Sequence, residues 1–134
     1  MNEERRIGIL IVDDDHDARL AVRALLQGAE DFEVVGETGE GAEGLFLARQ
    51  LEPDIVLLDY QMPFLNGRQV ADMLREESPH CRIVAFSGHL DRAPDWADAY
   101  FVKDRVSTLH EFLRDLINRD ATQRPPTSAG NSKT

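Results

Sequence analysis

Short apolar runs separated by helical patterns dominate the hydrophobic pattern of the chain. Three runs, Ile7–Val12, Ile55–Leu58 and Ile83–Phe86, are apolar at nearly every position rather than at every second one. Strands that are apolar on both faces are typical of a parallel sheet covered by helices on both sides. Two weaker runs, Phe32–Gly36 and Ala99–Val102, predict two further strands. We therefore expect a five-stranded parallel sheet.

Residues spaced for one face of a helix occupy the intervals between most of these runs. The apolar positions of the predicted helices are Ala18, Ala21, Val22 and Leu25; Ala42, Leu45 and Phe46; Val70, Met73 and Leu74; and Leu109, Phe112, Leu113, Leu116 and Ile117. Alternation of strands and helices predicts a doubly wound α/β domain with right-handed crossovers.

Small polar residues mark the expected helix ends. Asp15 and Asp17 are expected to begin the first helix, because their carboxylates can cap it and favour its dipole. Gly28 is a plausible stop for the same helix. Thr38 is a candidate N-cap for the second helix, and Ser107 is one for the last.

Length and composition bound the class of protein. The 134 residues suffice for one domain, and a net charge of −10 argues against nucleic-acid binding by this chain. No apolar stretch approaches the roughly 20 residues of a membrane span, and the N-terminus lacks a secretory signal. The single cysteine, Cys81, excludes an internal disulfide and suits the cytoplasm. We expect one domain over residues 1–120 and a disordered tail or linker over residues 121–134, which lack apolar periodicity.

Polar side chains follow the predicted strands at the points where the strands end. Asp13 and Asp14 follow the first strand, Asp59 the third, Ser87 the fourth and Lys103 the fifth. Ligands of open α/β sheets bind outside the carboxyl ends of the strands, so these groups are expected to meet. Each residue alone is more simply explained as a turn or cap, but the set together favours a site.

Three clustered carboxylates require a positive partner. The best candidate is Mg²⁺, a hard divalent cation that prefers oxygen ligands. Its charge and that of Lys103 would together balance the negative charges of Asp13, Asp14 and Asp59. An anionic group such as phosphate could then be held by the metal, Lys103 and Ser87, with Asp59 as nucleophile.

Four motifs in order give the chain a family resemblance: ILIVDDD, IVLLDYQMPFLNG, IVAFSGH and AYFVKD. Over Ile7 to about Asp120 the chain resembles the receiver domain of bacterial two-component response regulators, the CheY-like family. Asp104 follows Lys103 where many members have proline. This feature and the segment EVVGETGEGAEGLFLARQLEPDIVLLD resemble receivers that precede a helix-turn-helix domain.

The resemblance implies a role for each site residue. Asp59 would accept a phosphoryl group from the phosphohistidine of a histidine kinase. Asp13, Asp14 and Asp59 would hold Mg²⁺, with the backbone carbonyl of Gln61 as a further ligand. The domain would act as a switch and not as an enzyme, apart from gaining and losing its own phosphoryl group.

The resemblance also implies a switch and partners. Lys103 and Ser87 would contact the phosphoryl group, and the movement of Ser87 would let Tyr100 turn inward. The partners would be the histidine kinase and a downstream protein or output domain, and a homodimer is possible.

The sequence departs from the family between Ser87 and the fifth strand. Gly88 to Asp98 would have to hold two loops and the family's fourth helix, although three helical turns alone need about 11 residues. We predict at most a single turn near Pro94 to Ala97, hence a shortened or missing fourth helix. Trp96 is expected to pack this loop.

Two alternatives stay open at this point. The first is a receiver-like docking module that no longer uses phosphorylation, which the short fourth-helix region would suit. The second is a phosphohydrolase of the haloacid dehalogenase type, with Asp13 as nucleophile and Asp15 as acid. The chain lacks that family's later acidic pair and its cap, which disfavours the second.

Overall fold

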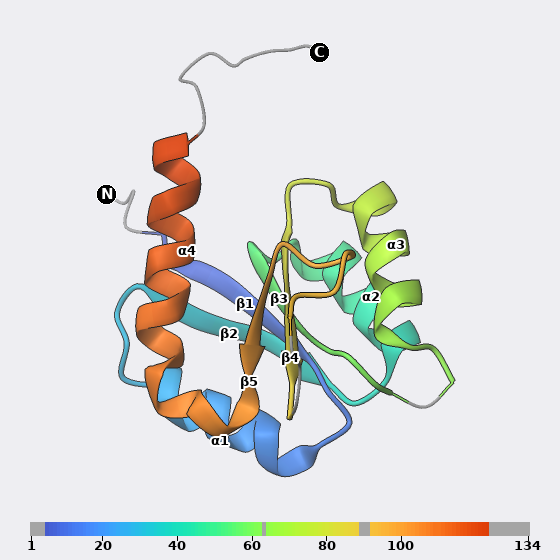
Figure 1. Ribbon diagram of the computed structural model, residues 1–134, viewed down its shortest axis with the longest axis horizontal. Coiled ribbons are helices and arrows are strands. Elements are labelled where there is room, and N and C mark those ends of the chain that lie inside the picture. The colour runs from blue at the N-terminus through green and yellow to red at the C-terminus, as the bar shows by residue number, and fades with distance from the viewer. Residues whose placement is uncertain (1–4, 63, 89–91, 124–134) are drawn as a thin grey trace.

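The computed structural model describes residues 5–62, 64–88 and 92–123, with side chains described through residue 119. Five parallel strands form one sheet in the order β2-β1-β3-β4-β5 (Figure 1). The strands are β1 (Ile7–Val12), β2 (Phe32–Thr38), β3 (Ile55–Asp59), β4 (Arg82–Ser87) and β5 (Ala99–Val102). The five predicted strands are confirmed. The ranges of β1 and β5 match the prediction at both ends.

Helices alternate with the strands up to β4. They are α1 (His16–Leu26), α2 (Gly41–Leu51), α3 (Gly67–Glu77) and α4 (Leu109–Gln123), and a 3₁₀ helix η1 (Lys103–Thr108) precedes the last. No helix in the described part of the chain is long and apolar enough to cross a membrane.

The sheet is covered on both faces, as its continuous apolar strands predict. On β1, Leu10 and Val12 face the cluster that includes α2 and α3, whereas Ile9 and Ile11 face the cluster that includes α1 and α4. All four side chains are essentially inaccessible to solvent. The doubly wound α/β fold is therefore confirmed.

The predicted helix ends are only partly correct. Asp15 is the N-cap of α1, and its carboxylate accepts the backbone N–H groups of Asp17 and Ala18. The cap prediction for Thr38 is wrong, because Glu40 occupies the N-cap of α2. The Thr38 hydroxyl instead accepts the Glu40 N–H and donates to Glu43 at 2.6 Å, which braces the turn that leads into α2.

The C-terminal segment differs from the prediction at both ends. Ser107 lies inside η1 and so does not cap a helix that begins at Leu109. The helix continues through Gln123, past the predicted boundary at Asp120. Backbone hydrogen bonds can extend a helix beyond its last apolar residue, and the first proline in the sequence after this helix is Pro125. Residues 124–134 lie outside the described residues, so a tail over them stays a prediction.

Three side chains expected to face the core are exposed, and one of them is Ala42 on α2. Phe46 is 53% exposed on α2, and Met73 is 42% exposed on α3. The buried face of α2 consists of Gly41, Gly44, Leu45 and Ala48, small residues that let the helix lie close to the sheet. Phe46 follows Leu45 by about 100° around the helix and therefore points away from the sheet.

The predicted loss of the fourth helix is confirmed for the described part of Gly88 to Asp98. Residues 92–98 contain one hydrogen-bonded turn, Ala97 N–H to Pro94 O at 3.2 Å, and no helix (Figure 1). Trp96 is 7% exposed and belongs to the cluster beneath α2 and α3, so it packs this loop as expected. His89, the last residue of the IVAFSGH motif, lies outside the described residues, as does Pro63.

Arginine 75 of α3 fastens this loop to the domain. Its guanidinium donates to Asp98 Oδ2 and to the backbone carbonyl of Trp96, each at 3.1 Å. Asp98 Oδ2 also accepts the Ile83 N–H at 2.8 Å. The loop thus takes its polar anchors from α3 and β4.

Candidate functional site

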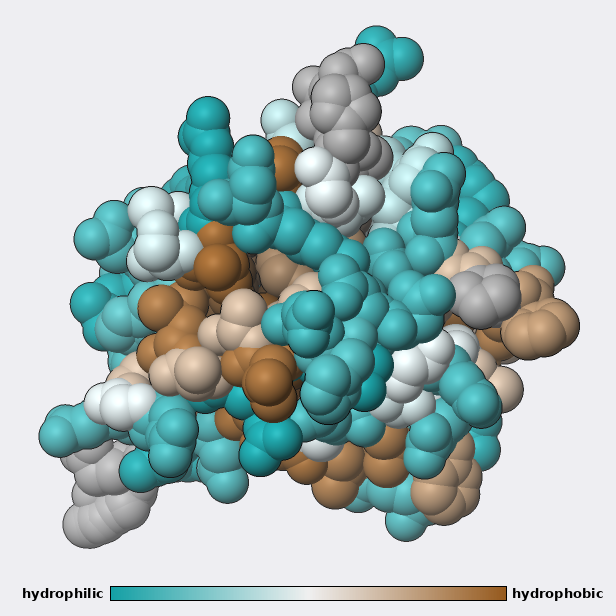
Figure 2. All heavy atoms as spheres, turned by 90° about the horizontal axis from the view of Figure 1, so that it is seen from below, coloured by the Kyte–Doolittle hydropathy of each residue, from teal (hydrophilic) through white to brown (hydrophobic). Residues whose placement is uncertain are grey.

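Strand register brings the predicted site residues to one edge of the sheet. Val12 is paired with Leu58 in the neighbouring strand, so Asp13 and Asp59 follow a matched pair. On the other side of β3, Asp59 is paired with Phe86, and Ser87 is then paired with Val102. Each functional side chain comes at or just after the last residue of its strand. Figure 2 looks onto this edge and shows polar side chains interleaved with apolar patches.

Three carboxylates converge there. One oxygen from each of Asp13, Asp14 and Asp59 lies within 4.8 Å of the other two. Asp13 is fully buried and Asp59 is 5% exposed, whereas Asp14 is exposed. Two of the three carboxylates are therefore shielded from solvent, and the third lies at the solvent side of the site.

Lysine 103 is the cation of this cluster. Its ammonium lies 2.8 Å from Asp13 Oδ2 and 3.9 Å from Asp59 Oδ2. The nearer contact has the distance of an ion pair but not the geometry of a hydrogen bond. Among the described residues Asp13 Oδ2 has no hydrogen-bond partner, while Asp13 Oδ1 accepts the Asp15 N–H at 2.9 Å. A buried carboxylate oxygen without a hydrogen bond calls for a further positive partner.

The protonation of Asp59 is shifted by its surroundings. Burial, followed by the negative charge of Asp13, raises the pKa of Asp59 to about 7, although Lys103 and the Gln61 N–H act in the opposite direction. The Gln61 amide donates to Asp59 Oδ1 at 3.3 Å. In the absence of another cation the Asp59 carboxyl group is thus only partly ionised near neutral pH. A cation at the cluster would favour its charged form.

The loop after Asp59 is held close by a glycine. A Cβ atom on Gly67 would lie 2.8 Å from the backbone oxygen of Asp59 and 3.0 Å from the Trp96 ring. Only a residue without a side chain allows α3 to begin against the backbone of Asp59. Asn66 and Gln69 form a capping box at that helix start. This is the physical reason for the NG pair at the end of the IVLLDYQMPFLNG motif.

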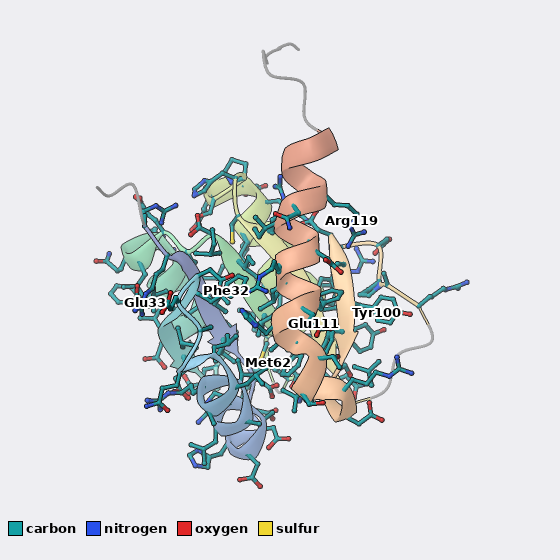
Figure 3. All side chains as sticks on the ribbon, turned by 90° about the vertical axis from the view of Figure 1, so that its left-hand side faces the viewer. Phe32, Glu33, Met62, Tyr100, Glu111 and Arg119 are labelled. Carbon is teal, nitrogen blue, oxygen red and sulfur yellow. The ribbon has the colours of Figure 1, made fainter. Side chains whose placement is uncertain are left out.

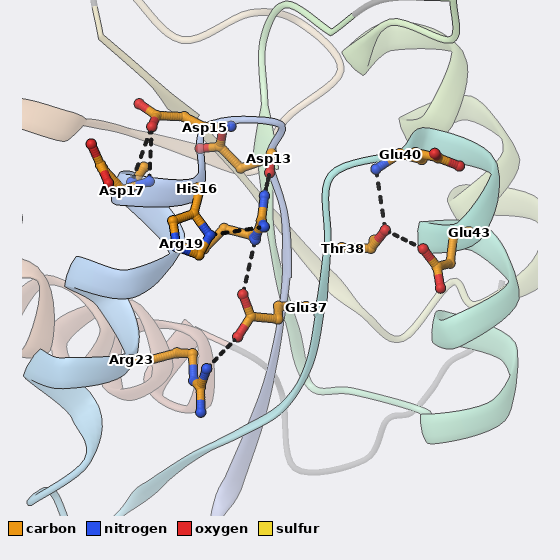
Figure 4. Close-up of polar contacts among 11 residues, drawn as sticks. Asp13, Asp15, His16, Asp17, Arg19, Arg23, Glu37, Thr38, Glu40 and Glu43 are labelled. Atoms are coloured by element: carbon orange, nitrogen blue, oxygen red, sulfur yellow. Dashed lines mark hydrogen bonds and ion pairs between the residues drawn. The ribbon is translucent and has the colours of Figure 1, made fainter.

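Arginine 19 is a site residue that the sequence analysis missed. Its Nη1 donates to the backbone carbonyl of Asp13 at 2.7 Å, and its Nε donates to Glu37 Oε1 on β2 at 2.8 Å (Figure 4). Arg23 pairs with the second oxygen of Glu37 at 2.9 Å. Arg19 thus fixes the turn that carries the two acidic residues. Its place on α1, one turn after the acidic triplet, was the only available signal.

Ser87 and Tyr100 lie on neighbouring strands beside the cluster. Ser87 ends β4 and is 9% exposed. Tyr100 is paired with Ala85, is half-buried, and packs against the cluster of α2 and α3, on the opposite side of the sheet from α4 (Figure 3). The structure therefore gives their positions, and their part in a switch stays a prediction.

Comparison with known proteins identifies the family. Residues 9–102 match the response regulator receiver domain. The chain is 40% identical over 110 residues to the nitrate/nitrite response regulator protein NarL of Escherichia coli, covering 78% of this chain and 51% of that protein. It is 44% identical over 127 residues to the transcriptional regulatory protein BtsR of Salmonella typhi, covering 89% and 53%. The chain thus spans about half the length of these relatives.

Solved structures agree. The signal receiver domain of the response regulator NarL from Mycobacterium tuberculosis has a TM-score of 0.73 and 30% identity, over 90% of this chain and 99% of that one. The fold and the acidic site define a signalling domain of the CheY-like class. The chain belongs to the response regulator receiver family of two-component systems.

The acidic cluster fits a small hard cation. Receiver domains generally bind Mg²⁺ at an acidic pocket, and the donors here are carboxylate oxygens, which Mg²⁺ prefers. The buried Asp13 Oδ2 without a hydrogen bond and the three oxygens within 4.8 Å support the fit. Asp13, Asp14 and Asp59 are the residues that would hold the ion.

Proposed function

We propose that this receiver accepts a phosphoryl group on Asp59 from a histidine kinase and thereby changes its contacts with a downstream protein or output domain. The observation that carries the proposal is the convergence of Asp13, Asp14, Asp59 and Lys103 at one sheet edge. Asp59 is better suited to transfer than Asp13, because the two Asp13 oxygens are already engaged by the Asp15 N–H and by Lys103 at 2.8 Å, whereas Asp59 Oδ2 lies 3.9 Å from Lys103.

The transfer is a displacement at phosphorus. An Asp59 carboxylate oxygen bonds to the phosphorus of the kinase phosphohistidine as the P–N bond breaks and the imidazole leaves. The Lys103 ammonium, 3.9 Å from Asp59 Oδ2, neutralises part of the charge that arrives with the phosphoryl oxygens. Arg19 keeps the turn of Asp13 in place through the carbonyl contact.

Asp13, Asp14, Asp59 and the backbone carbonyl of Gln61 form the proposed magnesium site. When bound, Mg²⁺ supplies positive charge against which the phosphoryl oxygens and the aspartates can be held together. The Gln61 N–H bond to Asp59 Oδ1 supports a place for this residue at the site.

Ser87 and Tyr100 form the proposed switch. The Ser87 hydroxyl and Lys103 move toward the phosphoryl group, and Tyr100 turns inward beside β4. Phosphorylation then shifts a pre-existing equilibrium between two arrangements of this edge. Tyr100 is half-buried and packs against one core cluster, so an inward turn would bury the rest of its side chain.

The relatives suggest the setting. NarL and BtsR are named as a response regulator and a transcriptional regulatory protein, and each is about twice as long as the matching segment. We infer that this receiver works in the cytoplasm and passes its signal to an output domain or separate protein, with homodimer formation as one route. A chain of net charge −10 does not itself bind nucleic acid in this proposal.

Two alternatives are weighed by the same geometry. A phosphohydrolase with Asp13 as nucleophile and Asp15 as acid is disfavoured by the family match, and Asp13 is fully buried with Lys103 against its second oxygen. A docking module without phosphorylation is favoured only by the lack of a helix among the described residues between β4 and β5, whereas the acidic cluster and Lys103 are complete.

The test against the docking module is an NMR titration with beryllofluoride and Mg²⁺, which together mimic an acyl phosphate. The proposal predicts shifts of the Ser87 and Tyr100 resonances in the natural chain and none in Asp59→Asn. Unchanged resonances in the natural chain would favour the docking module.

A further inference from the structure

A groove of about 890 Å³ lies between the loop after β3 and the segment before β5. One wall is the loop after β3 with the start of α3, and the other is the segment that precedes β5. Its lining residues are Tyr60, Gln61, Met62, Asn66, Arg68, Arg92, Ala93, Pro94, Asp95 and Trp96. The groove begins directly beside Asp59, yet none of the residues proposed for phosphoryl transfer lines it except Gln61.

An aromatic pair supplies the apolar part of the groove. The rings of Tyr60 and Trp96 stack at 6.1 Å with an interplanar angle of 15°. Trp96 is buried, whereas Tyr60 is 38% exposed and leaves one face for a partner. Met62 and Pro94 continue this surface. Such a stacked aromatic with an open side is the kind of anchor on which apolar side chains of a partner bind.

The charged part of the groove is cationic, in contrast to the chain as a whole. Arg68 forms an ion pair with Asp95 across the two walls. Arg92 makes no ion pair with any residue that the structure describes, so its guanidinium is available. On a chain of net charge −10, this groove is a local site for carboxylates.

The size of the groove matches a short helix. A helix about 10 Å across that rises 5.4 Å per turn occupies roughly 420 Å³ per turn, so about 890 Å³ accommodates about two turns. We propose that the groove binds a short amphipathic acidic helix of a partner protein, which replaces the missing fourth helix. Its apolar face rests on Tyr60 and Pro94, and a carboxylate pairs with Arg92. The unphosphorylated chain already displays this surface.

The test uses two designed peptides of about 12 residues, a length at which an isolated alanine-rich helix is marginal in water, so both peptides are compared at equal length and alanine content. Both carry leucines one helical turn apart, and the remaining positions are alanine with glutamate in one peptide and with lysine in the other. Trp96 is the only tryptophan of the chain, so its fluorescence reports binding at the groove itself. Titrations are made with the unphosphorylated full chain at physiological ionic strength, which screens distant charges.

The glutamate peptide is expected to bind and to change Trp96 fluorescence, and the lysine peptide to bind more weakly. Arg92→Glu is expected to weaken the glutamate peptide about tenfold or more. Arg119→Glu is the matched control, because it makes the same charge change on an exposed residue of α4 (Figure 3) and is expected to have little effect.

Three results would overturn the proposal. They are equal binding of the two peptides, equal losses in Arg92→Glu and Arg119→Glu, and binding without a change in Trp96 fluorescence. None of these results depends on whether Asp59 accepts a phosphoryl group.

Discussion

The raised pKa of Asp59 predicts that the metal-free receiver loses stability as the pH rises toward neutrality. The pKa is about 7 in the folded chain and 3.8 without the fold, chiefly because burial disfavours the charged form. A carboxyl group whose folded pKa is raised contributes its stability fully below the unfolded value. That contribution is lost as the pH rises from about 4 through about 7.

The magnitude follows from the two pKa values. They differ by about three pH units at 1.36 kcal/mol each, so ionising Asp59 in the folded chain costs at most about 4 kcal/mol. Asp59→Asn removes this penalty. Relative to the natural chain, it should be nearly neutral at pH 4 and stabilising by roughly 2–4 kcal/mol at pH 8 without Mg²⁺.

Urea unfolding in EDTA, followed by Trp96 fluorescence at several pH values, measures this difference. Asp31→Asn serves as a control of opposite sign. Burial alone would raise the pKa of Asp31, but hydrogen bonds from His110 and Arg114 lower this pKa below its usual value. The ionised Asp31 carboxylate therefore stabilises the folded chain above the pKa of the unfolded chain. This stabilisation is lost as the pH falls through the pKa of the folded chain. A pH-independent effect of Asp59→Asn would refute the reasoning, and saturating Mg²⁺ should shrink or reverse the difference.

Three further substitutions test the supports of the site. Gly67→Ala places a Cβ atom 2.8 Å from the Asp59 carbonyl oxygen and should lower the free energy of unfolding by about 1–3 kcal/mol in urea. Arg19→Met should weaken Mg²⁺ binding roughly tenfold, as measured by calorimetry, because the turn that carries Asp13 loses the hydrogen bond from Arg19 to the Asp13 carbonyl. Arg75→Met releases the loop that carries Trp96 and should shift the Trp96 fluorescence toward that of exposed tryptophan. It should also lower the free energy of unfolding by about 1–2 kcal/mol.

Matched variants keep these tests specific. Arg23→Met removes the other arginine on Glu37 but no contact to Asp13, so it should leave Mg²⁺ affinity nearly unchanged. If it weakens Mg²⁺ as much as Arg19→Met, the clamp has no special role. Arg49→Met breaks an exposed ion pair with Glu77 and should leave Trp96 fluorescence unaltered.

The parts of the fold that were predictable depend on burial along single strands. The runs Ile7–Val12 and Ala99–Val102 were correct at both ends, because a charged residue stands directly before and directly after each apolar run. The meeting of Asp13, Asp59 and Lys103 followed from the shared edge of parallel strands.

The predictions were wrong at positions where contacts between distant elements determine the structure. Thr38 has the side chain of an N-cap, yet its hydroxyl is used by Glu43, and α2 begins at Gly41. Phe46 fits a helical stripe, but small residues occupy the face that contacts the sheet. Arg19 resembles any surface arginine until Glu37 and the Asp13 carbonyl are placed around it. No local pattern in the sequence encodes these three outcomes.

The most direct test of the central claim is the position of the phosphoryl group after incubation with acetyl phosphate and Mg²⁺. Peptide mapping by mass spectrometry should locate it on the segment that contains Asp59, and neither Asp59→Asn nor the natural chain in EDTA should be labelled. A label on Asp13, or one that persists in Asp59→Asn, would contradict the account.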